Sequence, residues 1–190
     1  MKKLFFALII MLLAIPAFAA PTQKGNFVIT LPLVEWSSAE GDLYENAEGD
    51  GWTYLSLGAL GYQAQIEWFV IDGLAIGGVL GYESAERGDY SITATTIGPM
   101  VSYYFQMDQL LIPYAGIGYI YQTWEDDDGV TTDEGTSTTL RLKLGLAYML
   151  GNNLSLFGEF SYDMDEEEPD GGESVDGTAM TITAGIKAFF

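Results

Sequence analysis

The sequence predicts an all-β protein, an eight-stranded antiparallel up-and-down β-barrel. The 23 Gly, 12 Tyr, 10 Phe and 4 Trp of the 190 residues favour strands and turns over helices. From Asn26 onward, eight segments alternate apolar and polar residues with a period of two, which is the period of a strand with two different faces. Short turns and longer acidic stretches connect the segments in alternation. Such a pattern indicates a meander whose two ends meet different surroundings.

The first twenty residues have the features of an export signal. Two lysines precede a twelve-residue apolar run over 4–15, and the small residues Ala17 and Ala19 fit a signal-peptidase site. As a helix this run would span about 18 Å, which is short of the ~30 Å hydrocarbon core of a membrane. We therefore expect a cleaved signal peptide over 1–20 and one barrel domain over 21–190.

The eight alternating segments are predicted to be strands. The pattern is clearest in the sixth, where Leu142 and Leu144 share one face while Arg141 and Lys143 share the other. In the second segment the alternation changes phase near 59–60, which predicts a β-bulge. The predicted strands are 26–36, 52–71, 74–84, 90–105, 111–124, 137–150, 154–163 and 177–190.

The connections are too short to carry crossover helices, so neighbouring strands are expected to pair antiparallel. Eight strands paired in order leave two free edges, and closing the sheet into a barrel removes them. The short connections are Asp72-Gly73, 106–110 and 151–153, and the longer ones are 37–51, 85–89, 125–136 and 164–176.

Two barrels compete at this point. A soluble, lipocalin-like barrel would point its apolar residues inward, whereas a transmembrane barrel points them toward lipid. The polar faces here are rich in Gly, Ser and Thr, which suits a crowded interior better than a solvated exterior, and aromatic residues gather at the strand ends as in interfacial belts. We therefore predict a transmembrane β-barrel. The aromatic residues are Trp36, Trp52, Tyr54, Tyr82, Tyr90, Tyr121, Trp124 and Tyr162 beside the long connections, and Trp68, Tyr103, Tyr104, Phe105, Tyr148 and Phe190 beside the short ones.

The last strand resembles the C-terminal targeting strand of Gram-negative outer-membrane barrels. Thr183, Gly185, Ala188 and Phe190 take the positions of its polar, glycine and two hydrophobic residues. This resemblance implies recognition by the barrel-assembly machinery and an outer-membrane location.

Two further stretches carry a family resemblance: Leu60-Gly61-Tyr62 with 69–77, and 97–99 with 103–105. Together with the strand pattern they make the chain similar to the small OmpA/OmpX-type eight-stranded proteins of the outer membrane protein beta-barrel domain family. The resemblance implies the fold and the Gram-negative cell envelope, with outer-membrane lipid and lipopolysaccharide as surroundings. It leaves the role open, because that group includes adhesins and structural tethers.

The lumen of an eight-stranded barrel is just wide enough for side chains to fill it. We assign the charged residues Glu67, Arg141, Lys143, Glu159 and Lys187 to it, and expect all three cations to neighbour Glu159. Unpaired buried charge is costly, so these groups must pair or be hydrated. They form either a salt-bridged plug, which we favour, or a gated polar path for ions and small solutes. Gln63 and Gln65 are assigned to the same face.

The predicted long loops hold most of the 27 acidic residues, against 7 basic ones. This balance excludes sequence-independent nucleic-acid binding, which needs clustered Lys and Arg. Loosely bound Ca²⁺ or Mg²⁺ would suit such carboxylates, although a solvated acidic face is the preferred interpretation. Weak metal-ligand candidates are Asp163, Asp165, Glu167 and Asp170; no other cofactor is expected.

The absence of His and Cys removes most general bases and all thiol nucleophiles. Outer-membrane barrel enzymes resemble one another in using a catalytic His. A carboxylate pair such as Glu125 with Asp133 could act on sugars in principle, but solvation is the preferred role. The sequence thus predicts a non-enzymatic, monomeric barrel with a structural or surface-interaction role. The alternatives are a narrow porin-like channel and an adhesin that binds an extracellular ligand or surface through its loops.

Overall fold

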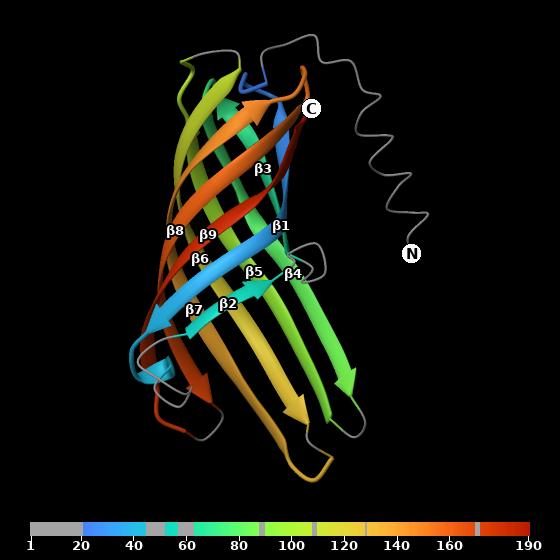
Figure 1. Cartoon of the computed structure of the whole chain (residues 1–190), viewed down its shortest axis with the longest axis vertical. Helices are drawn as coiled ribbons and strands as arrows, with labels where there is room; N and C mark the ends of the chain where they lie inside the picture. Colours follow the sequence, from blue (N-terminus) through green and yellow to red (C-terminus); the bar gives the residue numbers. More distant parts are fainter. Residues whose placement is uncertain are drawn as a thin grey trace.

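Neighbouring segments of the chain pair into one antiparallel sheet that closes on itself (Figure 1). The computed structural model describes residues 21–44, 52–56, 63–87, 90–107, 110–127, 129–169 and 172–190. Its strands are β1 (Phe27–Glu40), β2 (Trp52–Ser56), β3 (Gln63–Ile71), β4 (Leu74–Arg87), β5 (Tyr90–Tyr104), β6 (Leu111–Asp127), β7 (Thr132–Met149), β8 (Leu154–Pro169) and β9 (Val175–Phe189), with a short 3-10 helix η1 (Asp42–Tyr44) after β1.

Pairing of β1 with β9 closes the barrel, with a register that runs from Val28 opposite Phe189 to Glu40 opposite Thr178. On its other side β1 pairs with β3 near its start and with β2 near its end. The strands β2 and β3 are the two described parts of the predicted second strand, so the eight-stranded up-and-down barrel is confirmed. The chain end is held as well, since Phe27 and Phe190 exchange two backbone hydrogen bonds and stack their rings.

The predicted bulge at 59–60 lies outside the described residues. Register irregularities occur instead between Pro32 and Val34 of β1 and between Phe69 and Ile71 of β3. The irregularity in β1 shifts the phase of the strand, so that Thr30 and then Ser37 point inward while Trp36 points outward. If the alternation were counted without interruption along β1, the residues after this irregularity would be assigned to the wrong face of the sheet.

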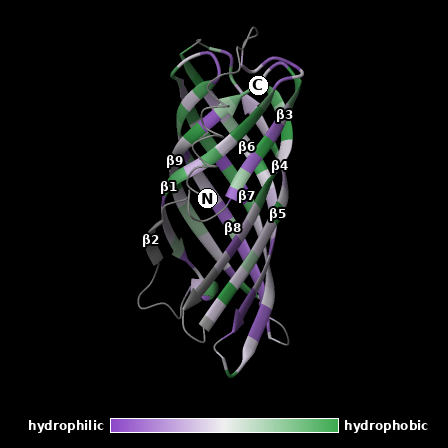
Figure 2. Ribbon diagram, turned by 90° about the vertical axis from the view of Figure 1, so that its right-hand side faces the viewer, coloured by the Kyte–Doolittle hydropathy of each residue, from purple (hydrophilic) through white to green (hydrophobic). Residues whose placement is uncertain are grey.

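Apolar side chains face outward and polar or small ones face the lumen, as the alternation in the sequence predicts. In β7 the outward Leu142 and Leu144 are exposed, the latter at 62%, whereas the inward Lys143 and Ala147 are buried. Figure 2 shows hydrophobic and hydrophilic residues alternating along the strands. In the described part of the chain, no helix has the length and apolar character needed to cross a membrane.

The strands at the long-loop end extend beyond their predicted limits. The hairpin of β6 and β7 stays paired up to Asp127 opposite Thr132, and β8 continues to Pro169 (Figure 1). The prediction that these acidic stretches are loops was therefore wrong for most of their length. Both faces of the extension are polar, so the apolar alternation that reveals a strand within the membrane is lost there.

Most of the described aromatic residues lie where interfacial belts require them. Trp36, Tyr82 and Tyr121 are exposed toward the long-loop end, and Trp68 and Tyr148 toward the short-turn end. Two assignments were wrong. Tyr104 is fully buried in the lumen, in contrast to the 45% exposure of its neighbour Tyr103, and Trp124 lies half-buried on the inward side of β6 with its indole Nε1 buried. The side chains of Trp52, Tyr54 and Tyr90 lie outside the described part.

Site-directed spin labels test this inversion directly, because the chain contains no native Cys. Labels at Leu142, Leu144 and Ile182 should report hydrocarbon in reconstituted vesicles, since these side chains are exposed on the outer face. Labels at Thr139 and Thr183 should report the lumen and be protected from lipid-soluble relaxation agents. Water at the first set together with hydrocarbon at the second would contradict the fold.

Candidate functional site

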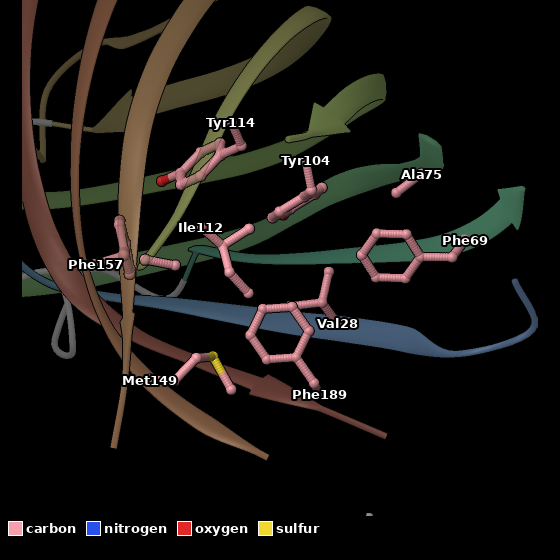
Figure 3. Packing of buried hydrophobic residues seen from close by; sticks show 10 residues of the cluster. Val28, Phe69, Ala75, Tyr104, Ile112, Tyr114, Met149, Phe157 and Phe189 are labelled. Carbon is pink, nitrogen blue, oxygen red and sulfur yellow. The ribbon is translucent and has the colours of Figure 1, made fainter. Parts of the chain in front are cut away.

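The lumen is filled in layers, beginning with an apolar layer at the short-turn end. Figure 3 shows side chains from several strands converging on the barrel axis there. The ring of Tyr104 stacks on Tyr114 at 5.1 Å and meets the edge of Phe69 at 5.2 Å. These rings pack against one another inside the lumen. Its members are Val28, Phe69, Ala75, Tyr104, Ile112, Tyr114, Ala147, Met149, Phe157 and Phe189.

The segment before β1 crosses the same end of the barrel. The carbonyl oxygen of Thr22 accepts a hydrogen bond from the Gly73 amide, and the Thr22 hydroxyl accepts one from Gln106 Nε2. The amide of Lys24 donates to Asp72 in the predicted Asp-Gly turn, where Gly73 has a φ of 79°. Because Thr22 is buried, this segment adds a cover to the apolar layer.

A charged layer lies next to the apolar one and is centred on Lys143. Its ammonium donates hydrogen bonds to Gln65 Oε1 and Met100 Sδ, both at 2.9 Å. Carboxylate oxygens of Glu67 and Glu159 lie 4.0 and 3.9 Å from the same nitrogen. Three of the five predicted interior charges are thus brought together, and all three side chains are buried.

The contacts of Lys187 differ from the predicted one with Glu159. Its ammonium donates to the hydroxyls of Thr30 and Tyr104, and lies 4.3 Å from the ring centroid of Tyr114. Among the described residues no carboxylate lies within ion-pair distance, although Glu67 accepts a hydrogen bond from the same Tyr104 hydroxyl. Tyr104 therefore connects the cation to the anion, while aromatic faces stabilise the charge of Lys187.

Arg141 pairs with Asp163 rather than with the predicted Glu159. Its Nε and Nη2 atoms donate to the two carboxylate oxygens at 2.9 and 2.7 Å, which is the bidentate geometry that makes such pairs strong. These residues lie directly opposite each other in the β7–β8 register. Inward alternation along β8 continues through Asp163, which is buried.

Beyond the outer aromatic belt, the short helix η1 lies against β8 and β9 at the mouth of the lumen. Tyr44 of η1 donates to Asp165 Oδ2, and Thr139 donates to Oδ1. Burial raises the pKa of the Asp165 carboxyl, against the lowering effect of the Thr139 hydrogen bond. A methyl group at Gly177 would lie 2.6 Å from the Tyr44 ring, so the close approach of this ring requires a glycine.

The metal-ligand candidates that the structure describes are not grouped as a coordination site. Asp163 is committed to Arg141, Asp165 binds two hydroxyls, and Asp170 lies outside the described residues. Within the described ranges no three His, Cys, Asp or Glu residues are grouped so that they could hold a metal ion. Specific cation binding therefore stays a prediction.

The carboxylate pair considered for sugar chemistry is not assembled either. Glu125 lies opposite Glu134, whereas Asp133 lies opposite Asp126. Because adjacent strand residues point to opposite faces, Glu125 and Asp133 lie on different sides of the sheet. A concerted acid–base role for these two groups is thus excluded by their geometry.

Several lumen residues were missed at the level of sequence. Tyr104, Tyr114 and Met100 contact the charged layer, yet each sits in a run of apolar residues that gives no sign of a polar function. The available signal was strand phase, because Met100, Ser102 and Tyr104 alternate with exposed residues of β5. Their partners across the lumen were not predictable from that signal.

The fold and lumen can now be compared with known proteins. The family model described as "Outer membrane protein beta-barrel domain" matches residues 5–187. The chain belongs to this family. A search of curated proteins gave no match to the sequence. The membership confirms the predicted resemblance and places the protein in the bacterial outer membrane.

Solved structures of similar fold are outer-membrane barrels with low sequence identity. Neisserial surface protein A has a TM-score of 0.59 at 15% identity and covers 87% of this chain and 97% of its own. Ail, the attachment invasion locus protein of Yersinia pestis, has 0.54 at 11% and covers 88% and 100%. OprG from Pseudomonas aeruginosa has 0.52 at 16% and covers 90% and 99%. At these identities the likeness shows the fold alone.

Removal of the central cation should destabilise the barrel. Lys143→Met leaves Glu67 and Glu159 buried without their shared counter-charge, so we expect a loss of about 3–5 kcal/mol in the free energy of unfolding. Urea titration with a gel assay for heat-modifiable barrel measures the change. The exposed Lys24→Met is the matched control and should change it by less than ~0.5 kcal/mol. Equal effects of the two substitutions would contradict the charged-layer model.

Glu167 beyond the belt gives a pH-dependent test. Burial raises the pKa of its carboxyl above the ordinary value, so its charged form costs stability at neutral pH. Glu167→Gln should therefore stabilise by less than about 1 kcal/mol at pH 7, because solvent screens a half-exposed group. The gain should disappear as pH falls through the raised pKa and below the ordinary one of 4.5. A gain that grows on acidification would show the opposite sign of the shift.

Proposed function

We propose that this outer-membrane barrel is a non-enzymatic protein closed to solute flow, which serves as a rigid base for an acidic sheet at the cell surface. The observation that carries the proposal is the filled lumen. An apolar layer, the Lys143 layer and the Arg141–Asp163 pair follow one another along the axis. Each of these would have to rearrange before a hydrated ion could pass.

The energetic cost of opening the lumen favours a plug that blocks ions and solutes over a path that conducts them. Opening the Lys143 layer would separate buried charges, and removing one partner from a buried pair typically costs several kcal/mol. The aromatic layer adds packed rings that no change in charge pairing would displace. A narrow channel is therefore the less favoured function, and it requires motion of both layers.

The extended strands support the surface part of the proposal. Glu125, Glu134 and Glu168 are exposed on paired strands beyond the outer aromatic belt. In barrels of this class the long connections face outward from the cell, so these carboxylates would meet lipopolysaccharide and divalent cations, with an extracellular surface as a further partner. Ail is described in complex with a heparin analogue, sucrose octasulfate. A chain of net charge −20 would repel such a polyanion.

The non-enzymatic part rests on chemistry. The chain has no His or Cys. Four of the inward carboxylates that the structure describes are paired: Glu67 and Glu159 with Lys143, Asp163 with Arg141, and Asp165 with Thr139 and Tyr44. Such pairing stabilises charge and leaves few groups to accept a proton from a substrate.

Planar-bilayer recording tests closure. The wild type should give no steady conductance steps. Tyr104→Ala with Phe69→Ala should give them, because the two substitutions remove a pair of rings from the apolar layer and also the Tyr104 hydroxyl that joins Glu67 to Lys187 among the interior charges. The matched control is Tyr103→Ala, one residue away on the outer face, which should stay silent.

Folding of each variant is checked by the difference in migration of boiled and unboiled samples. Wild-type steps that vanish on substitution of Glu159 or Arg141 would overturn the closed barrel and establish the channel. Silence of a folded double variant would show that the charged layers alone close the lumen, against the role given to the rings.

A further inference from the structure

A hollow lies on the outer face of the sheet where β5, β6, β7 and β8 extend beyond the outer aromatic belt. Its volume is about 770 Å³, within the range of about 300–1,000 Å³ that small-molecule sites occupy. It begins at Thr123, two residues or ~7 Å along β6 beyond the exposed Tyr121. Because this end of the barrel carries the long connections, the hollow opens toward the outside of the cell.

One row of lining side chains crosses the four strands in register. Thr95 lies opposite Thr123, which lies opposite Thr136 on its other side. Thr136 in turn lies opposite Glu168. All four share the outward phase of their strands, and all except Thr136 are exposed. Since neighbouring strands lie ~4.8 Å apart, the row offers hydroxyl groups and a carboxylate at steps of about that length.

A second row, two residues further from the membrane, places two carboxylates side by side. Glu125 lies directly opposite Glu134, and both side chains are exposed and line the hollow. Like charges directly opposite each other on two strands are destabilising. Among the described residues that line the hollow there is no Lys or Arg to offset them. The pair therefore favours a ligand that brings positive charge.

The floor of the hollow is formed before any ligand arrives. A methyl group at Gly135 would lie 2.7 Å from Trp124 Cζ2, so the indole lies against the β7 backbone on the lumen side and supports the floor from behind. The threonine side chains are β-branched and stiff at χ1. A ligand that binds here has little ordering of the protein to offset, which favours its affinity.

We propose that this hollow is a binding site for a short oligosaccharide of amino sugars, a ligand that carries both hydroxyl and ammonium groups. Its hydroxyls hydrogen-bond to the row of threonines. An ammonium between Glu125 and Glu134 relieves their repulsion and donates charge-assisted hydrogen bonds. At ~30 Å³ per water-sized group, the volume holds about 25 such groups, which is the scale of about two sugar rings.

Other ligands use less of the lining. A metal ion alone would leave the threonine row and most of the volume empty, and in the described ranges no three acidic side chains are grouped to hold one. A polyanionic sugar would be repelled by the carboxylates. The inference rests on the proposed role of the extended strands as an acidic sheet at the cell surface, and it names the ligand class of that sheet.

Isothermal titration calorimetry of the purified barrel tests the site, in zwitterionic detergent free of lipopolysaccharide and at mildly acidic pH. The probe is the disaccharide of glucosamine, of which the wild type should bind one molecule. The N-acetylated disaccharide keeps the rings but lacks the positive charge, and it should bind about ten-fold more weakly. Spermidine has amines without hydroxyls and should be weaker by about the same factor.

Glu125→Gln with Glu134→Gln should weaken binding of the probe about ten-fold, because it removes the paired carboxylates. Removing like charges does not threaten the fold, and the difference in migration of boiled and unboiled samples checks it. The matched control is Glu40→Gln with Glu83→Gln, which removes the same charge from exposed residues outside the hollow and should change affinity less than about two-fold.

Thr123→Val with Thr136→Val tests the hydroxyl row, because valine keeps the branched shape without the hydroxyl. Affinity for the probe should fall about five-fold. Thr138→Val, on the same face of β7 but outside the lining, is the control and should leave the affinity unchanged.

The inference is overturned if the wild type does not bind the probe, if spermidine or the N-acetylated sugar binds equally well, or if site and control variants lose binding equally. Competition by the isolated core oligosaccharide of lipopolysaccharide would place the ligand in the cell's own membrane, and lack of competition would place it outside; either result keeps the site. Binding and conductance fail separately, since a closed barrel that binds no probe refutes the ligand alone, whereas a conducting barrel that binds it refutes the closed lumen alone.

Discussion

Hydrocarbon offers no partner to a backbone amide or carbonyl, and this constraint organises the whole protein. Every strand must find neighbours on both sides, which is why β1 pairs with β9 and with β3 at once. Closure then fixes a narrow bore, and the bore forces inward residues to pack or pair. This narrow lumen explains why the interior contains the apolar layer, the Lys143 layer and the Arg141–Asp163 pair. The same constraint explains why Leu and Ile residues face outward, toward lipid.

The interior balances charge by two different means. Arg141 has its carboxylate directly opposite on the next strand, so one pair of hydrogen bonds satisfies it. Lys143 and Lys187 instead share groups from several strands, including hydroxyls, an amide, a thioether and aromatic faces. Such shared arrangements are stiff, because moving any one member disturbs several others. A stiff interior follows from these contacts, and the proposed role as a base for surface strands depends on that stiffness.

The sequence was sufficient to predict which side chains point toward lipid and which toward the lumen. It was not sufficient to predict which side chains contact one another across the lumen. Alternation placed Leu142 outside and Lys143 inside, because two media sort residues with a period of two. Alternation alone does not say which strand lies across the lumen, so the contact of Lys143 with Glu67 required the three-dimensional register. Tyr103 and Tyr104 show the same limit, since both are aromatic residues at a strand end and phase alone separates them. Where both faces are polar, as beyond Thr123, the signal itself fades.

The contact between Phe27 and Phe190 has a consequence for how the molecule comes into being. The opening strand cannot acquire its second neighbour until nearly the entire polypeptide has left the ribosome and been exported. Until β1 and β9 pair, backbone groups and apolar side chains of the chain are exposed, and such exposure favours aggregation. From this connectivity we expect that the chain is protected from aggregation in transit and that its assembly in the membrane is assisted.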